Sequence, residues 1–269
     1  MSRGDDEPKV IPQNRYHALI EKIFFDGYTK GAHSIDFKRE DLKSAATALK
    51  IVLPENLGDV IYAMRFRVPM PDSVLKTQPK DYEWLIELAG RSLYRFCLRK
   101  ANRIVPNPAL VRIRIPDSTP EIIAAYALDD EQALLAKVRY NRLIDIFLGL
   151  TTYSLQNHLR TTVKGMGQIE IDELYVGLDK HGCHYVIPVQ AKGGNDQISV
   201  VQTTQDIQCC AQKYPGLRCR PISAQFVSSD QIALFELTVE DDEIRVVEER
   251  HYKLVPAAEL VREEISTYR

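Results

Sequence analysis

The apolar positions in the first third of the chain recur mostly with helical spacing. In residues 14–28 this spacing predicts a helix that ends near Gly27. The segment "SIDFKREDLKSAATALKI" predicts a short extended piece and then a second helix, entered through an acidic first turn at Glu40 and Asp41. After Pro54, the segment "ENLGDVIYAMRFR" predicts a third helix.

A two-stranded hairpin is predicted next. The segment "YEWLIELAGRSLYRFCLRKANRIV" from Tyr82 to Val105 has a turn signal at Ala89 and Gly90 between aromatic and β-prone stretches. Helix, short strand, helix, helix and hairpin is the order of a winged helix-turn-helix, here with an unusually long connector that contains prolines.

A proline-bounded linker with a short strand is expected over residues 106–118. We therefore expect two domains. Residues 1–110 would form a mainly helical N-terminal domain of winged-helix type, for DNA binding or protein interaction, and residues 111–269 would form an α/β domain.

The hydrophobic period changes within this second domain. Helices are expected from about residues 119 and 129, and a further helix in "TTYSLQNHLRTT", ending near Thr162. The run from Gln168 to Lys192, "QIEIDELYVGLDKHGCHYVIPVQAK", instead predicts strand, turn and strand. Because both strands are largely apolar, we expect them to be central and covered on both faces. A helix over about 197–213 and strands in "RPISAQFV" and "QIALFELTV" are expected to follow.

Composition adds limits to this picture. The chain of 269 residues, 45% hydrophobic and 27% charged, has the balance of an ordinary globular protein. It has no apolar run of the length of a membrane span, and acidic residues occupy the place of a secretory signal's apolar stretch, so a cytoplasmic protein that does not insert into membranes is expected. Five cysteines without CxxC spacing argue against a disulfide framework or a zinc knuckle.

Charge is distributed unevenly. Residues 1–110 carry 18 Lys and Arg against 14 Asp and Glu, whereas the remainder carries 17 against 23. The most basic window, residues 91–114, has no acidic residue, which favours contact with a nucleic-acid backbone. A solvated strand face is the plain alternative. The residues expected to bind nucleic acid are Arg91, Arg95, Arg99, Lys100 and Arg103.

Candidate chemistry lies where the two apolar strands begin and end. Glu170, Asp172 and Glu173 open the first strand, and Gln190 and Lys192 close the second. In an antiparallel hairpin these ends are adjacent, and alternation puts Gln190 and Lys192 on one face. Carboxylate and amide oxygens suit Mg²⁺, and a neighbouring lysine can position water and offset charge on a phosphate.

This arrangement resembles the PD-(D/E)xK nuclease superfamily, which includes restriction endonucleases and Holliday-junction resolvases. The triplet "QAK" has Gln190 in place of the usual acid, which is similar to the Mrr-type restriction endonucleases. The resemblance covers about residues 140–240. It implies a restriction-endonuclease-like mixed sheet flanked by helices, and Mg²⁺-dependent hydrolysis of DNA with Mn²⁺ as a substitute. It also implies a restriction or DNA-defence role, which a homodimer that cuts both strands would suit.

The resemblance assigns roles to the catalytic candidates. Glu173 begins the apolar part of its strand and is the favoured metal ligand. Asp172 is a close second, since a bulge or a one-residue register change would exchange the two. Gln190 would ligate metal through its amide oxygen or orient water, and Lys192 would position the water. Glu170 would be a solvent-facing or supporting group.

Other interpretations remain open at this point. Lys192 is also readable as a strand-end lysine that extends to water. The fold can be retained without catalysis, which would leave a DNA-binding regulator, and a Holliday-junction-type nuclease is a further alternative. The N-terminal domain can instead recruit the second domain to a larger complex.

Overall fold

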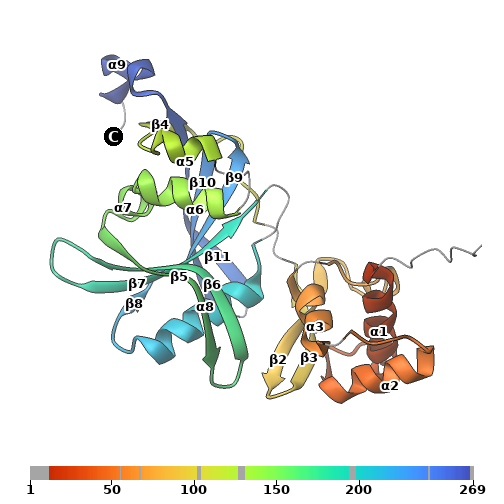
Figure 1. Cartoon of the computed structure of the whole chain (residues 1–269). Helices are drawn as coiled ribbons and strands as arrows, with labels where there is room; N and C mark the ends of the chain where they lie inside the picture. Colours follow the sequence, from red (N-terminus) through yellow and green to blue (C-terminus); the bar gives the residue numbers. More distant parts are fainter. Residues whose placement is uncertain are drawn as a thin grey trace, which may run out of the picture. The chain divides into compact units, whose positions relative to one another are not determined.

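The computed structural model describes residues 12–54, 56–66, 68–101, 104–126, 131–193, 198–241 and 243–266. The chain divides into two compact units, shown in Figure 1. The first comprises Met1–Ala101 with Lys164–Gly167, and the second comprises Asn102–Val163 with Gln168–Arg269. This division does not test independent folding, so the expected domain boundary near residue 110 stays a prediction.

The first unit combines helices with a three-stranded antiparallel sheet of order β1-β3-β2. The helices and the hairpin predicted from the sequence are present in their expected order. The elements are α1 (Pro12–Gly27), β1 (Ser34–Lys38), α2 (Arg39–Leu49), α3 (Leu57–Phe66), α4 (Asp72–Leu75), β2 (Tyr82–Gly90) and β3 (Leu93–Lys100).

An aromatic cluster forms the centre of the first unit's core. Phe24 of α1 packs edge-on against Trp84 of β2 and Phe96 of β3, with ring centroids 5.1 and 5.2 Å apart. All three rings are buried. Since such pairs contribute beyond their buried area, this contact fixes α1 on the sheet.

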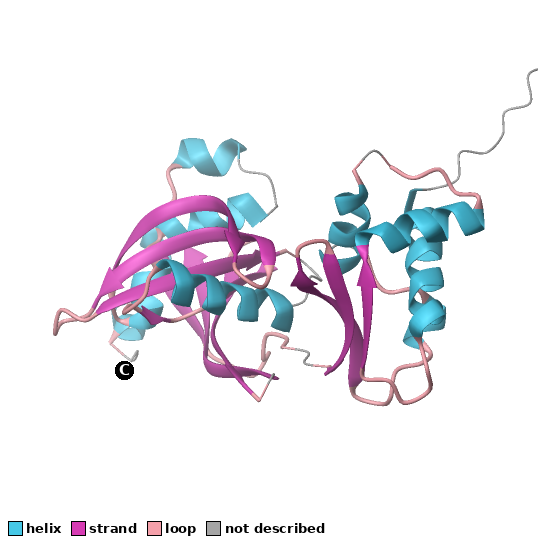
Figure 2. Cartoon of the chain, turned by 90° about the horizontal axis from the view of Figure 1, so that it is seen from below, coloured by secondary structure: helices cyan, strands magenta, loops and turns pink. Residues whose placement is uncertain are grey.

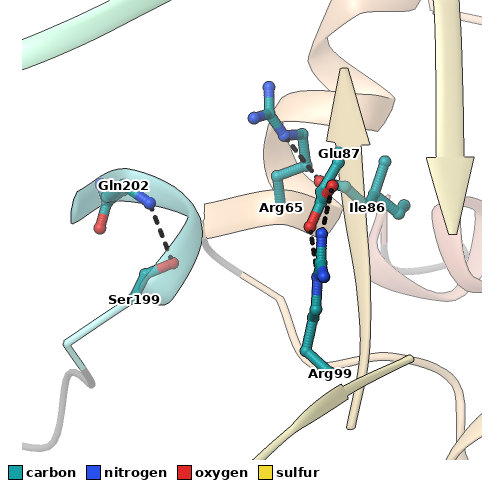
Figure 3. Close-up of polar contacts among 6 residues, drawn as sticks. All are labelled: Arg65, Ile86, Glu87, Arg99, Ser199 and Gln202. Atoms are coloured by element: carbon teal, nitrogen blue, oxygen red, sulfur yellow. Dashed lines mark hydrogen bonds and ion pairs between the residues drawn. The ribbon is translucent and has the colours of Figure 1, made fainter. Parts of the chain in front are cut away.

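Two arginines of the first unit are engaged with β2, as Figure 3 shows. Arg65 of α3 donates from Nε to the carbonyl of Ile86 at 3.0 Å, and burial lowers the pKa of its guanidinium to about 10. Arg99 of β3 donates to Glu87 at 2.9 Å. The basic side chains of this unit are therefore in part structural.

The second unit is built on a mixed sheet of order β4-β11-β10-β9-β7-β6-β5, with β8 paired beside the start of β7. β7 runs parallel to β9 and antiparallel to β6. The strands are β4 (Arg112–Pro116), β5 (Thr151–Val163), β6 (Gly167–Leu178), β7 (His184–Lys192), β8 (Arg218–Cys219), β9 (Ile222–Ser228), β10 (Gln231–Glu240) and β11 (Glu243–Val255). The helices are α5 (Glu121–Tyr126), α6 (Glu131–Tyr140), α7 (Leu143–Leu148), α8 (Val200–Lys213), the 3₁₀ turn η1 (Ala257–Glu259) and α9 (Arg262–Ile265).

Helices cover both faces of this sheet (Figure 2). On one face, Leu134 of α6 and Leu143 of α7 belong to the same core as Val189 of β7. On the other face, α8 contributes Val200 to a core with Phe235 of β10. The prediction of an α/β domain whose apolar strand pair is central and covered on both faces is confirmed. None of the described helices is long and apolar enough to cross a membrane.

The prediction of a helix over residues 151–162 is wrong, because this segment is the edge strand β5. Its side chains are exposed from Tyr153 to His158, so the strand has no alternating apolar face to reveal its period. Leu155 and Leu159 instead stand four residues apart, as on a helix. The β-branched threonines near both ends of the segment are the signal that favoured a strand.

Candidate functional site

Strand register divides the expected site residues between the two faces of the sheet. Glu173 lies opposite Val189 in the β6–β7 pair. Directly opposed residues share a face and faces alternate along a strand, so Asp172 shares the face of Gln190 and Lys192. Glu173 points to the other face.

Asp172 is held at the end of β7. Its Oδ2 accepts a hydrogen bond of 2.8 Å from the backbone N–H of Ala191. Burial raises the pKa of this carboxyl, and the nearby charge of Glu170 adds to the rise, while the Ala191 N–H and the charges of Lys192 and His158 oppose it. The carboxylate of Asp172 is therefore close enough to Lys192 and Glu170 to interact with their charges.

Gln190 and Lys192 are both buried although polar, and Lys192 is only 8% exposed. Gln190 donates from Nε2 to both carboxylate oxygens of Asp206, at 3.0 and 3.2 Å, and to the carbonyl of Glu170 at 3.3 Å. Its Oε1 is buried and has no hydrogen-bond partner among the described residues. A buried acceptor without a hydrogen-bond partner costs free energy, and a bound ligand or water would remove that cost.

Asp206 of α8 is a site residue that the sequence analysis did not single out. It is 2% exposed, and burial raises the pKa of its carboxyl well above the ordinary value, with Asp172 also raising it. Ser199 caps the N-terminus of this helix, and its side chain accepts from the N–H of Gln202 (Figure 3). Asp206 lies on the buried face of α8 with Thr203 and Cys210, and an acid within such a stripe was the available signal.

The space between α8 and the ends of β7 and β9 is small. A cavity of about 10 Å³ is lined by residues that include Gln190, Lys192, Asp206 and Ser223. Such a volume holds a single water at most. Glu170 is more open, and its carboxylate pairs with Arg160 at 3.2 Å and His158 at 3.5 Å.

The structure does not bring Glu173 together with Gln190 and Lys192, which corrects the expectation that this acid lies beside them. Glu173 is fully buried on the opposite face, where its Oε1 accepts from Nε of Arg139 at 2.9 Å and from Ser154 at 2.6 Å. The physical reason is register: β6 and β7 pair without the bulge that would rotate Glu173 to the other face.

A divalent cation fits the donor types on the Asp172 face. Asp172 and Glu170 supply carboxylates, and Gln190 supplies a buried amide oxygen in need of a partner. Mg²⁺ commonly takes one or two carboxylates and completes its shell with water and phosphate. Within the described residues, no three His, Cys, Asp or Glu side chains are grouped so as to hold a metal by themselves.

The basic residues expected to bind nucleic acid are placed differently from one another. Arg95 pairs with Asp36 across β1 and β3, and Arg99 pairs with Glu87. Arg91 is exposed in the turn before β3, and Lys100 ends that strand. Arg103 lies outside the described residues.

Comparisons with protein-family models, with curated proteins and with solved structures give no match for this chain.

Proposed function

We propose that this chain is a metal-dependent nuclease of the PD-(D/E)xK type that hydrolyses DNA phosphodiester bonds. The observation that carries the proposal is the shared face of Asp172, Gln190 and Lys192 at the adjoining ends of β6 and β7. The chain order supports it too: helices, the strands β5, β6 and β7, then α8, then β9 parallel to β7. We propose that this mixed sheet flanked by helices is a restriction-endonuclease-like arrangement.

The roles follow from the chemistry of the side chains. Asp172 and Oε1 of Gln190 would hold Mg²⁺, or Mn²⁺ in its place, with Glu170 at the more open side. The bound cation supplies Lewis-acid activation of the phosphate and a lowered pKa of water. Lys192 positions the attacking water and offsets charge on the phosphate. Asp206 accepts from the Gln190 amide nitrogen through its two carboxylate oxygens, so Oε1 points away from Asp206.

The first unit is proposed to bind the DNA. Its order of elements and its β1-β3-β2 sheet support a winged helix, and exposed Arg91 and Lys100 in the β2–β3 hairpin supply positive charge. Phosphate contacts of this kind position a protein without reading sequence. A cytoplasmic DNA-defence role and a homodimer that cuts both strands belong to the same proposal.

Cleavage of supercoiled plasmid tests the proposal. The wild-type chain should nick or linearise plasmid with Mg²⁺ or Mn²⁺ and leave it intact with EDTA. Asp172→Asn and Lys192→Ala should each lose about 100-fold or more in rate, whereas Lys180→Ala, an exposed lysine in the β6–β7 turn, should not. Thermal melting of each variant shows that it is folded. Intact plasmid with the wild type would refute the activity, and full cleavage by Lys192→Ala would refute that residue's role.

A DNA-binding regulator without catalysis is the second candidate function. It is favoured by Gln190 in place of an acid and by the engagement of its amide with Asp206. This alternative predicts that wild type and Lys192→Ala bind DNA equally and that neither cleaves it. Cleavage assays on four-way junctions beside plasmid would distinguish a junction-specific nuclease from the proposed nuclease and from the regulator.

A further inference from the structure

A second cavity lies on the Glu173 side of the sheet, away from the proposed catalytic residues. Its volume is about 290 Å³, and it is an open cavity lined by the α6–α7 junction and the strands β5 and β6. Arg139, Arg142, Tyr153, Ser154 and Tyr175 are among its lining residues. This volume is near the lower end for small-molecule sites.

Two guanidinium groups reach this cavity with donors to spare. Arg139 uses Nε for Glu173 at 2.9 Å, and Arg142 uses Nε for Asp145 at 2.8 Å. An arginine carries further N–H donors on its two terminal nitrogens, in a plane that matches carboxylate or phosphate oxygens. The two acids hold the guanidiniums in position and leave those terminal groups for another acceptor.

Tyr175 adds a neutral donor from the sheet. The residue is 4% exposed, and its hydroxyl is buried without a hydrogen-bond partner in the described part of the chain. Burial raises the pKa of this phenol, and the neighbouring Glu173 carboxylate adds to the rise while Arg139 opposes it, so the group stays protonated and can donate. A buried hydroxyl left in this state is costly unless a ligand accepts from it.

We propose that this cavity binds a phosphate monoester through Arg139, Arg142 and Tyr175. The two arginine forks and the phenol together exceed what the two oxygens of a carboxylate can accept, whereas a terminal phosphate presents three acceptor oxygens. The uncommitted donors of the two arginines and the phenol outnumber the one uncommitted acceptor, Oε2 of Glu173, so an anion is the charged partner that fits them.

The cavity also offers apolar and aromatic surface to the organic group that carries the phosphate. Val138 and Ile144 supply apolar surface to the cavity, and Tyr153 is a lining aromatic ring that is 59% exposed. Aromatic side chains stack on nucleobases without sequence preference. The ligand class is therefore a phosphate monoester on an aromatic carrier, as in a nucleoside monophosphate or the 5′ end of a nucleic-acid strand.

Calorimetric titration of the full chain tests this site, with inorganic phosphate, adenosine 5′-monophosphate and adenosine as probes. The monophosphate should bind saturably and displace inorganic phosphate, and adenosine should bind at least about tenfold more weakly. Tyr175→Phe should weaken the monophosphate about tenfold without lowering the melting temperature, since it removes a hydroxyl with no protein partner. Arg142→Gln should weaken it at least as much. Tyr252→Phe, another buried tyrosine of the same core, is the matched control and should bind as wild type.

Oligonucleotides with and without a 5′-phosphate distinguish the two sources of the group. Tighter binding of the phosphorylated strand than of adenosine 5′-monophosphate identifies a strand end, and the reverse identifies a free nucleotide. Absence of saturable binding by every phosphate probe, or wild-type affinity in Tyr175→Phe, would overturn the proposal. Lys192→Ala should leave this binding unchanged, so a failure of the proposed nuclease activity is separable from a failure of this site.

Discussion

The carboxylate of Glu173 lies 2.9 Å from Nε of Arg139, on the face of the sheet opposite Gln190 and Lys192. This pair links β6 to α6 and keeps a fully buried carboxylate compensated. Glu173 therefore has a role in the fold, and Asp172 is the acid that shares a face with Gln190 and Lys192.

Arg139→Ala should lower the free energy of unfolding by about 2–3 kcal/mol, because it leaves the buried Glu173 carboxylate without its cationic partner. The value is below that of a fully buried pair, since the arginine is more than a third exposed. Glu173→Gln should cost less, as the amide oxygen can still accept from Ser154. Urea unfolding of both variants measures the difference, and equal losses would contradict this account of the pair.

The same pair makes a prediction about activity. Glu173→Gln should retain most plasmid cleavage, within about fivefold of wild type, because its carboxylate faces away from Lys192. Asp172→Asn should abolish it. Rates for both variants, measured with Mg²⁺ on folded protein, decide between the two acids. If Glu173→Gln were the inactive one of the two, the β6 register would be the wrong guide to the metal site.

Gln190 is hydrogen-bonded to Asp206, so replacing Gln190 by the acid that is usual in the PD-(D/E)xK superfamily also affects Asp206. Gln190→Glu alone puts a carboxylate against that of Asp206, where like charges destabilise each other. We expect the single variant to keep cleavage but to need more Mg²⁺ for half-maximal rate. Asp206→Asn added to it should return that requirement toward wild type and raise the rate. A metal titration of single and double variants tests the coupling, and additive effects would refute it.

The pKa of Asp206 predicts how stability depends on pH. Burial raises the pKa in the folded chain, so the folded state favours the protonated carboxyl. Its contribution is fully present below the unfolded pKa and is lost as pH rises through the raised folded value. Asp206→Asn removes this loss. The variant should match wild type in acid and exceed it at neutral pH by a few degrees in melting temperature, where about 1 kcal/mol corresponds to 2–4 °C.

The control for this prediction is a metal-free buffer containing EDTA, because a cation beside Asp172 would favour the charged form of Asp206. Asp179→Asn is a suitable comparison. Its carboxyl lies in the exposed β6–β7 turn, and the Cys183 N–H lowers its pKa. If the melting temperatures of Asp206→Asn and of wild type changed in parallel over the whole pH range, the pH dependence could not be assigned to Asp206.

Residue patterns predicted the central strands β6 and β7 and the shared face of Gln190 and Lys192, because an apolar run with polar ends has a recognisable form. They did not distinguish Asp172 from Glu173, since adjacent residues differ only by strand register and no local signal sets it. β5 was misread because an exposed edge strand buries almost no periodic face. Asp206 escaped because its role depends on α8 packing over the ends of β7 and β9, which is a tertiary contact.

The ion pair between Arg95 and Asp36 bears on DNA binding by the first unit. Their ion pair engages the Arg95 guanidinium, and its hydrogen bonds lower the pKa of Asp36. If the β2–β3 hairpin contacts phosphate, Asp36→Asn should release Arg95 and tighten binding, while Arg91→Gln should weaken it. In the plot of log affinity against log salt, Arg91→Gln should reduce the slope by about 0.9 and Asp36→Asn should increase it. Fluorescence anisotropy over a salt series measures both slopes. Slopes equal to that of wild type would assign DNA contact to another surface and favour a protein-interaction role for this unit.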